Sequence, residues 1–98
     1  MFEWNEANIA HIAEHGVTPQ EAEEVITNNP LDIDYSERNG EIRIRQVGET
    51  AAKRILAVIS TLRNGKTRVV TAYPPSRSLQ ATYLNYRGYV QDGKENPS

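Results

Sequence analysis

Histidines and arginines are the residues with the clearest chemical capacity in this 98-residue sequence. His11 and His15 are the only histidines, and they stand four residues apart in front of Gly16. Two imidazoles at this spacing lie on one side of a helix. They could bind a metal ion, transfer protons as an acid and a base, or fill a structural position at the end of the helix.

A metal site has the least support among these three roles. Two imidazoles supply half of a tetrahedral coordination shell, and the chain has no cysteine that could complete it with a thiolate. The H-E-x-x-H motif needs a glutamate directly after the first histidine, whereas Glu14 directly precedes the second. We therefore expect no metal ion and no other cofactor. Proton transfer and a structural bond to the backbone both stay open for the histidines.

Arginines alternate with apolar residues in EIRIRQV (41–47). Residues two apart in a strand point to the same side, so Arg43 and Arg45 share one face, and Ile42 and Ile44 share the other. A planar guanidinium group binds phosphate oxygens in pairs. The pattern therefore predicts a strand with one cationic face.

A second group of candidates lies further along the chain. Arg68 falls in KTRVVTAY (66–73), and Tyr73 and Arg77 stand where this segment gives way to a helix. Arginines beside an aromatic residue are typical of a surface that binds polyanions. The alternative is a solvated sheet face whose arginines offset the charge of acidic helices.

Charge is divided unevenly along the chain. Residues 1–37 contain nine carboxylates and no lysine or arginine, although the net charge is only −2. Residues 38–90 contain ten basic residues against Glu41 and Glu49. Such a division predicts one face suited to polyanions and another that repels them.

Two helices joined as a helical hairpin are expected at the N-terminus. The first runs between Asn5, a suitable N-cap, and Gly16, a natural residue after a helix end. In TPQE, Thr18 caps the second helix, proline takes its first position and Glu21 completes a capping box. NNP (28–30) ends this helix.

Four β segments and a last helix follow. The segments cover residues 31–35, 41–47, 54–61 and 66–73, with room for a short earlier strand at F-E-W. The third is nearly all apolar, as in a central strand covered on both faces, and the turn LRNG joins it to the fourth as a hairpin. Ser76 can cap a helix over residues 77–87.

This order of elements predicts an α+β fold with an antiparallel sheet of about four strands. Residues 1–90 form a single domain, and the polar residues 91–98 form a flexible tail. The longest apolar run, ILAVI, is too short to cross a bilayer, and no basic stretch precedes the first apolar residues. We expect a cytoplasmic protein without a membrane partner.

The motifs, taken together, resemble those of the BrnT family of bacterial toxins. The resemblance covers roughly residues 2–84. Its most specific parts are the opening F-E-W, the later H-G-V (15–17), Arg43 five residues before Gly48, and the closing RVVTA.

The resemblance implies a fold similar to the RelE ribonucleases and an endoribonuclease that cuts mRNA without a metal ion and thereby blocks translation. It also implies a ribbon-helix-helix antitoxin as partner, and it leaves a homodimer open. His15, Arg43 and Arg68 match polar positions of the family pattern. The candidate catalytic residues are His15, Arg43, Arg68 and Tyr73, and the candidate RNA-binding residues are Arg45 and Arg77.

The chain also departs from the family pattern. Tyr73 replaces an arginine, two prolines follow it, and Leu79 stands where an acidic residue would lie. These departures motivate an alternative: a non-catalytic binding module on a RelE-like scaffold, which binds an antitoxin-like partner or itself.

Overall fold

The structure, a computed structural model, describes residues 1–88 as an α+β fold. In chain order its elements are β1 (Phe2–Glu3), α1 (Glu6–Ala13), α2 (Pro19–Thr27), β2 (Leu31–Arg38), β3 (Glu41–Glu49), β4 (Ile55–Arg63), β5 (Lys66–Tyr73) and α3 (Arg77–Arg87). The expected end of the domain at residue 90 and the expected tail, 91–98, lie outside the described residues.

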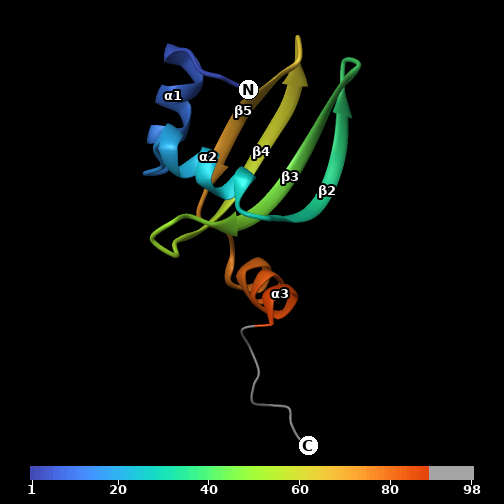
Figure 1. Ribbon diagram of the computed structural model, residues 1–98. Coiled ribbons are helices and arrows are strands. Elements are labelled where there is room, and N and C mark those ends of the chain that lie inside the picture. Colours follow the sequence, from blue (N-terminus) through green and yellow to red (C-terminus); the bar gives the residue numbers. More distant parts are fainter. Residues whose placement is uncertain (89–98) are drawn as a thin grey trace, which may run out of the picture.

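The strands form one mixed sheet in the order β1-β5-β4-β3-β2 (Figure 1). The four long strands are antiparallel to their neighbours, as expected. The short strand β1 adds a fifth, because Phe2 and Glu3 pair in parallel with Thr67 and Arg68 at the edge of β5. The prediction of a purely antiparallel sheet is therefore corrected to a mixed one.

Both long hairpins turn on an Asn-Gly pair. Asn39 and Gly40 join β2 to β3, Asn64 and Gly65 join β4 to β5, and all four have positive φ. Two consecutive residues with positive φ match the twist of an antiparallel pair. The strands are accordingly longer than predicted, and the expected four-residue turn shortens to two residues.

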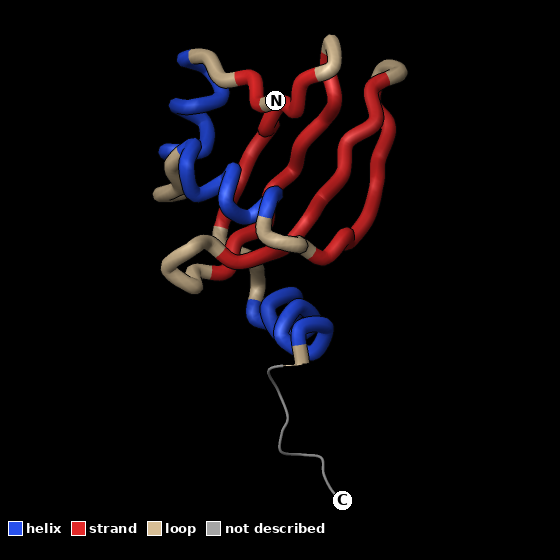
Figure 2. The backbone as a smooth tube through the Cα atoms, in the orientation of Figure 1, coloured by secondary structure: helices blue, strands red, loops and turns tan. Residues whose placement is uncertain are grey.

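The helices lie on both faces of the sheet. Ile12 of α1 and Val25 of α2 pack with Leu56 and Val58 of β4. Tyr83 of α3 packs with Ala57, which points to the opposite face because it alternates with Leu56 and Val58. We call the surface beneath α1 and α2 the helix-covered face. Figure 2 shows α3 set apart from these two helices, at one end of the sheet.

The predicted caps are confirmed. The side chains of Asn5, Thr18 and Ser76 each accept a backbone hydrogen bond at the start of a helix, and Glu21 completes its capping box. The predicted burial of β4 on both faces is also confirmed. No helix in residues 1–88 is long and apolar enough to span a membrane.

The predicted helical hairpin holds only roughly. α1 ends at Ala13, and residues 14–16 form a turn that closes with Gly16 at φ +73°. His15 therefore lies in this turn and not in the helix. α1 packs on β5, whereas α2 packs on β3 and β4, so both helices lie mainly on the sheet.

Gly48 permits the close approach of α2 to β3. A Cβ atom at this position would lie 3.1 Å from Val25 Cγ1 and 3.2 Å from Pro30 Cβ. We expect Gly48→Ala to lower the free energy of unfolding by about 1–3 kcal/mol, because overpacking displaces the helix. Urea unfolding measures this change. Gln46→Ala, on the same face of β3, is the control and should lower the free energy of unfolding less. If Gly48→Ala and the wild type unfold at the same urea concentration, the close packing is contradicted.

Candidate functional site

Strand alternation collects the basic side chains of the sheet on one face. The register pairs Arg43 with Thr61 and Thr61 with Arg68, so these three residues of β3, β4 and β5 point the same way. We call this surface, opposite the helix-covered face, the arginine face. Its basic residues are Arg38, Arg43, Arg45, Arg63, Lys66 and Arg68, and its acidic residues are Glu3, Asp34 and Glu41.

Three of these arginines line one hollow of about 350 Å³ together with α1. Arg43, Arg63 and Arg68 come from β3, β4 and β5, and His11 and Asn8 come from α1. We call this the arginine hollow. Guanidinium groups from three strands beside an imidazole form a site for an anion that carries several oxygens.

The arginines of this hollow differ in how firmly they are held. Glu41 pairs with both Arg43 and Arg63, through its Oε1 at 3.2 Å from Arg43 Nε and its Oε2 at 3.5 Å from Arg63 Nη2. Arg68 has no ion pair within residues 1–88, and its buried Nη1 has no hydrogen-bond partner there. Glu3, its neighbour across β1 and β5, likewise has a buried Oε1 without a partner. Arg68 thus has unused donor capacity.

A second group adjoins the arginine hollow. Arg45 donates two hydrogen bonds to the Asp34 carboxylate, at 3.2 and 2.7 Å, and one from Nη1 to the Tyr73 hydroxyl oxygen at 3.4 Å. The bonds to Asp34 raise the pKa of Arg45 most, and the bond to Tyr73 raises it further. Arg43 and Arg45 together line a smaller hollow of about 200 Å³. Arg43 therefore connects the two groups.

The histidines lie along the same border of the site. The ring centroids of His11 and His15 are 6.1 Å apart, and His15 meets Tyr73 edge-on at 6.2 Å. His11 lines the arginine hollow, and His15 lies one step further toward Tyr73. The predicted stacking of the two histidines on one side is confirmed, although His15 has left the helix.

Two sets of hydrogen bonds fix the histidines. The Asn8 amide donates to the carbonyl oxygens of Glu3 and Val69, both at 3.1 Å, and so ties α1 to β1 and β5. Arg54 Nη1 donates to the Gly16 carbonyl at 2.8 Å, next to His15. These contacts position both imidazoles beside β5.

The Glu21 carboxylate completes the anchor at Arg54. It accepts hydrogen bonds from Arg54 Nη1 at 3.1 Å and from the Thr18 backbone N–H at 3.0 Å. The backbone bond from Thr18 lowers the pKa of Glu21 most, and Arg54 lowers it further. The carboxylate therefore stays charged at neutral pH and holds the turn that carries His15.

The predicted site residues are mostly brought together. Arg43 and Arg68 line the arginine hollow, and His15, Tyr73 and Arg45 form the adjoining group. Arg77 is not part of either: it is exposed at the start of α3 and lines neither hollow.

Sequence reasoning left proton transfer open for His11 without placing it among the candidate catalytic residues, and it missed Arg63 as a member of the arginine hollow. The sequence pattern predicts a third strand that ends at residue 61 and places Arg63 in the following turn, whereas β4 reaches Arg63. Arg63 is two residues after Thr61 and four after Ile59, so strand alternation would have placed it on the arginine face.

The site has groups that can act on a phosphate. Among the described residues, no cluster of three or more His, Asp or Glu side chains could hold a metal ion. Arginines can bind phosphate oxygens and stabilise charge that develops on them. Imidazole and phenol groups can transfer protons at the same place.

The chain matches a known protein family over most of its length. The family model described as "Ribonuclease toxin, BrnT, of type II toxin-antitoxin system" matches residues 4–78. This range contains both histidines and all the arginines of the arginine hollow. No curated protein matches the chain.

Glu41 limits the anion affinity of the arginine hollow. Glu41→Gln removes the carboxylate that neutralises Arg43 and Arg63, so we expect affinity for a polyanion such as heparin to rise by about threefold to tenfold at low salt. Glu37→Gln makes the same charge change on the helix-covered face and serves as the matched control. The salt concentration at which each variant elutes from a heparin column measures its affinity. Equal shifts for the two variants would contradict an anion site on the arginine face.

Proposed function

Because the chain belongs to the BrnT family of ribonuclease toxins of type II toxin–antitoxin systems, we propose that it cleaves RNA at the arginine face without a metal ion. One observation carries the proposal: guanidinium groups from three separate strands line one hollow beside a histidine. A solvated sheet face would not need its cations to converge on a single concave site.

Metal-free cleavage of RNA proceeds by attack of a 2′-oxygen on the adjacent phosphorus. Negative charge grows on the phosphorane, a base takes the proton of the 2′-hydroxyl, and an acid protonates the departing 5′-oxygen. Arg43 and Arg68 hold the phosphate in our proposal, and Arg63 assists them. Arg68, which has no ion pair and one Nη1 donor without a partner within residues 1–88, is suited to the charge that appears only during the reaction.

His15 and Tyr73 are the proton-transfer groups that the sequence favours, and the geometry supports adding His11. Imidazole titrates near neutral pH and can serve as either base or acid. His11 borders the arginine hollow itself, whereas His15 contacts Tyr73 at its margin. We assign the two proton transfers to His11 and His15, and we place the Tyr73 ring beside a nucleobase of the RNA.

Arg45 and Arg77 have lesser roles in this scheme. Arg45 is engaged by Asp34 and Tyr73, so it orients the tyrosine ring more than it binds phosphate. Arg77 lies apart from the hollow, where it contacts the RNA backbone away from the cleaved bond.

The biological setting follows from the same proposal. Cleavage of mRNA in the cytoplasm stops translation, and a ribbon-helix-helix protein is the antitoxin that relieves it. The departures at Tyr73 and Leu79 from the family pattern do not touch Arg43, Arg63 or Arg68. They therefore leave the phosphate-binding part of the site complete.

Arg43→Gln and Arg68→Gln should each slow cleavage of a single-stranded RNA in EDTA-containing buffer by about 10²–10³-fold, because each removes a donor to the developing charge. Each should also flatten the plot of log affinity against log salt by about 0.7 for one lost phosphate contact. Lys53→Gln, which removes one charge from the loop between β3 and β4, is the control. The assignment fails if the salt slope is the same in all four proteins.

His11→Gln and His15→Gln test the proton transfers. If one imidazole acts as base and the other as acid, the wild-type kcat/KM has a bell-shaped dependence on pH, and each variant loses one limb and about 10²–10⁴-fold in rate. Single-turnover cleavage between pH 5 and pH 9 measures the profile. A variant that keeps both limbs would exclude its histidine from proton transfer.

A further inference from the structure

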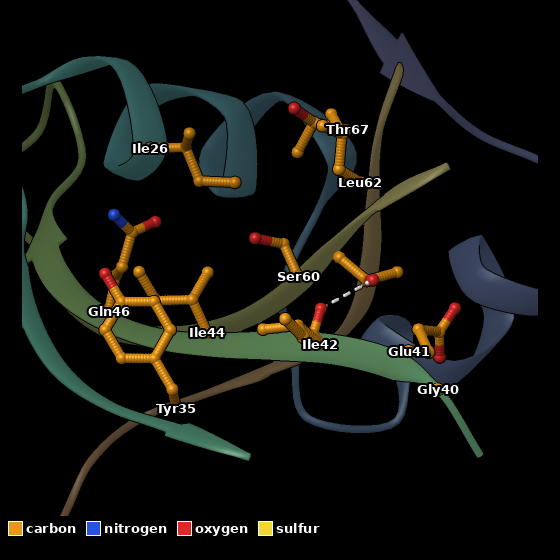
Figure 3. A pocket seen from close by; sticks show the side chains of 11 residues that line it. Ile26, Tyr35, Gly40, Glu41, Ile42, Ile44, Gln46, Ser60, Leu62 and Thr67 are labelled. Carbon is orange, nitrogen blue, oxygen red and sulfur yellow. Dashed lines mark hydrogen bonds between the residues drawn. The ribbon is translucent and has the colours of Figure 1, made fainter. Parts of the chain in front are cut away.

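An apolar hollow of about 580 Å³ lies on the helix-covered face, opposite the arginines. Its apolar side chains come from β2, β3, β4 and α2, and we call it the apolar trough: Tyr35, Ile42, Ile44, Leu62 and Ile26. Figure 3 shows Ile26 reaching from α2 toward Ile44 and Ser60 on the strands. α1 and α2 cover only part of this face, so the trough remains open.

The trough exposes large apolar side chains that RNA cleavage does not explain. Leu62, Tyr35 and Ile42 are 72%, 64% and 62% exposed, although their strands belong to the central sheet. Contiguous apolar surface of this kind is rare on a monomer and marks a site of association. The hollow is open along β2, β3 and β4, and three strands span about 10 Å, close to the diameter of one helix.

The charges around the trough are acidic. The register places Asp32 and Glu37 of β2 on this face, with no lysine or arginine of the sheet beside them. Glu23, whose carboxylate accepts a hydrogen bond from Trp4 Nε1, lies one turn before Ile26 on α2, and residues 1–37 contain no lysine or arginine. The carboxylate of Glu37 has no hydrogen bond or ion pair within residues 1–88. A partner with basic side chains beside an apolar stripe would therefore fit both features.

We infer that the apolar trough is the docking site of the antitoxin, which binds as an amphipathic helix with an apolar stripe flanked by lysine and arginine. The inference rests on the family function, because a type II toxin must offer its protein antitoxin a surface. An amphipathic helix in an apolar groove is a common mode of recognition. The helix would extend the layer that α1 and α2 begin.

A second copy of this chain fits the trough poorly. Two copies joined face to face would bring two acidic rims, each with Asp32 and Glu37, into one interface without a lysine or arginine of the sheet to offset them. Like charges juxtaposed across an interface oppose association. The acidic rim therefore selects a basic partner over self-association.

Docking at the trough largely separates antitoxin binding from RNA binding, because the sheet lies between the two surfaces and only Glu41 and Thr61 line both hollows. The test measures binding of the purified protein encoded by the gene that adjoins this one, by isothermal titration calorimetry. Ile42→Ser with Leu62→Ser should weaken binding at least about 100-fold, because two buried apolar contacts are lost. Glu37→Lys should weaken it by about fivefold to tenfold at low salt and less at high salt.

Matched variants on the other face give the control. Arg43→Gln with Arg63→Gln should bind the same protein within about twofold of the wild type. The Ile42→Ser, Leu62→Ser variant should still cleave RNA, because neither residue touches the arginine hollow. Both side chains are exposed, so circular dichroism should report a folded protein with a melting temperature near that of the wild type.

Three outcomes overturn the inference. The trough variant could bind as tightly as the wild type, the wild type could fail to bind at all, or the trough variant could alter only the oligomeric state in light scattering, as for a second copy. The proposed ribonuclease fails separately. The wild type could leave RNA intact while the trough variant loses its affinity for the protein encoded by the adjoining gene. In that case the docking inference holds and the proposed ribonuclease activity is wrong.

Discussion

The alternation of side chains along β3 is the constraint on which the molecule depends. Ile42, Arg43, Ile44 and Arg45 point to opposite faces in turn, so one strand supplies both an apolar surface and a cationic one. A slip of one residue in the pairing would exchange the two faces completely. The Asn-Gly turns at the tips of the two long hairpins set this register. The division of charge along the chain thereby becomes a division in space.

α1 converts a cationic sheet face into a site with proton-transfer groups. Ile12 packs into the core beneath the helix-covered face, and the side of the helix that carries it lies against β5. Asn8 anchors the same helix to the backbone of β1 and β5, and Arg54 holds the turn after it. The histidines meet the arginines because packing, capping and one ion pair act on the same short segment.

Local signals in the sequence predicted the helices and the face on which Arg43, Arg45 and Arg68 lie. Capping residues and period-two alternation act over a few positions, so both can be recognised without tertiary structure. The pairing of β1 with β5 and the meeting of His11 with Arg63 join residues far apart in the chain. The Asn39–Gly40 pair was a local signal that could have lengthened the second and third strands. Arg77 is close to Tyr73 in the sequence, and this closeness suggested that it belongs to the site. The start of α3 instead leaves Arg77 outside both hollows.

Convergence of the guanidinium groups on one anion is the central claim, and NMR tests it directly. The protein labelled with ¹⁵N at arginine and histidine side chains is titrated with a short RNA in which hydrogen replaces the 2′-hydroxyl that would attack the phosphate. The Nε–H signals of Arg43, Arg63 and Arg68 and the imidazole signals of His11 should shift together with one dissociation constant. Signals that shift separately, or not at all while the RNA binds, would contradict a single site on the arginine face.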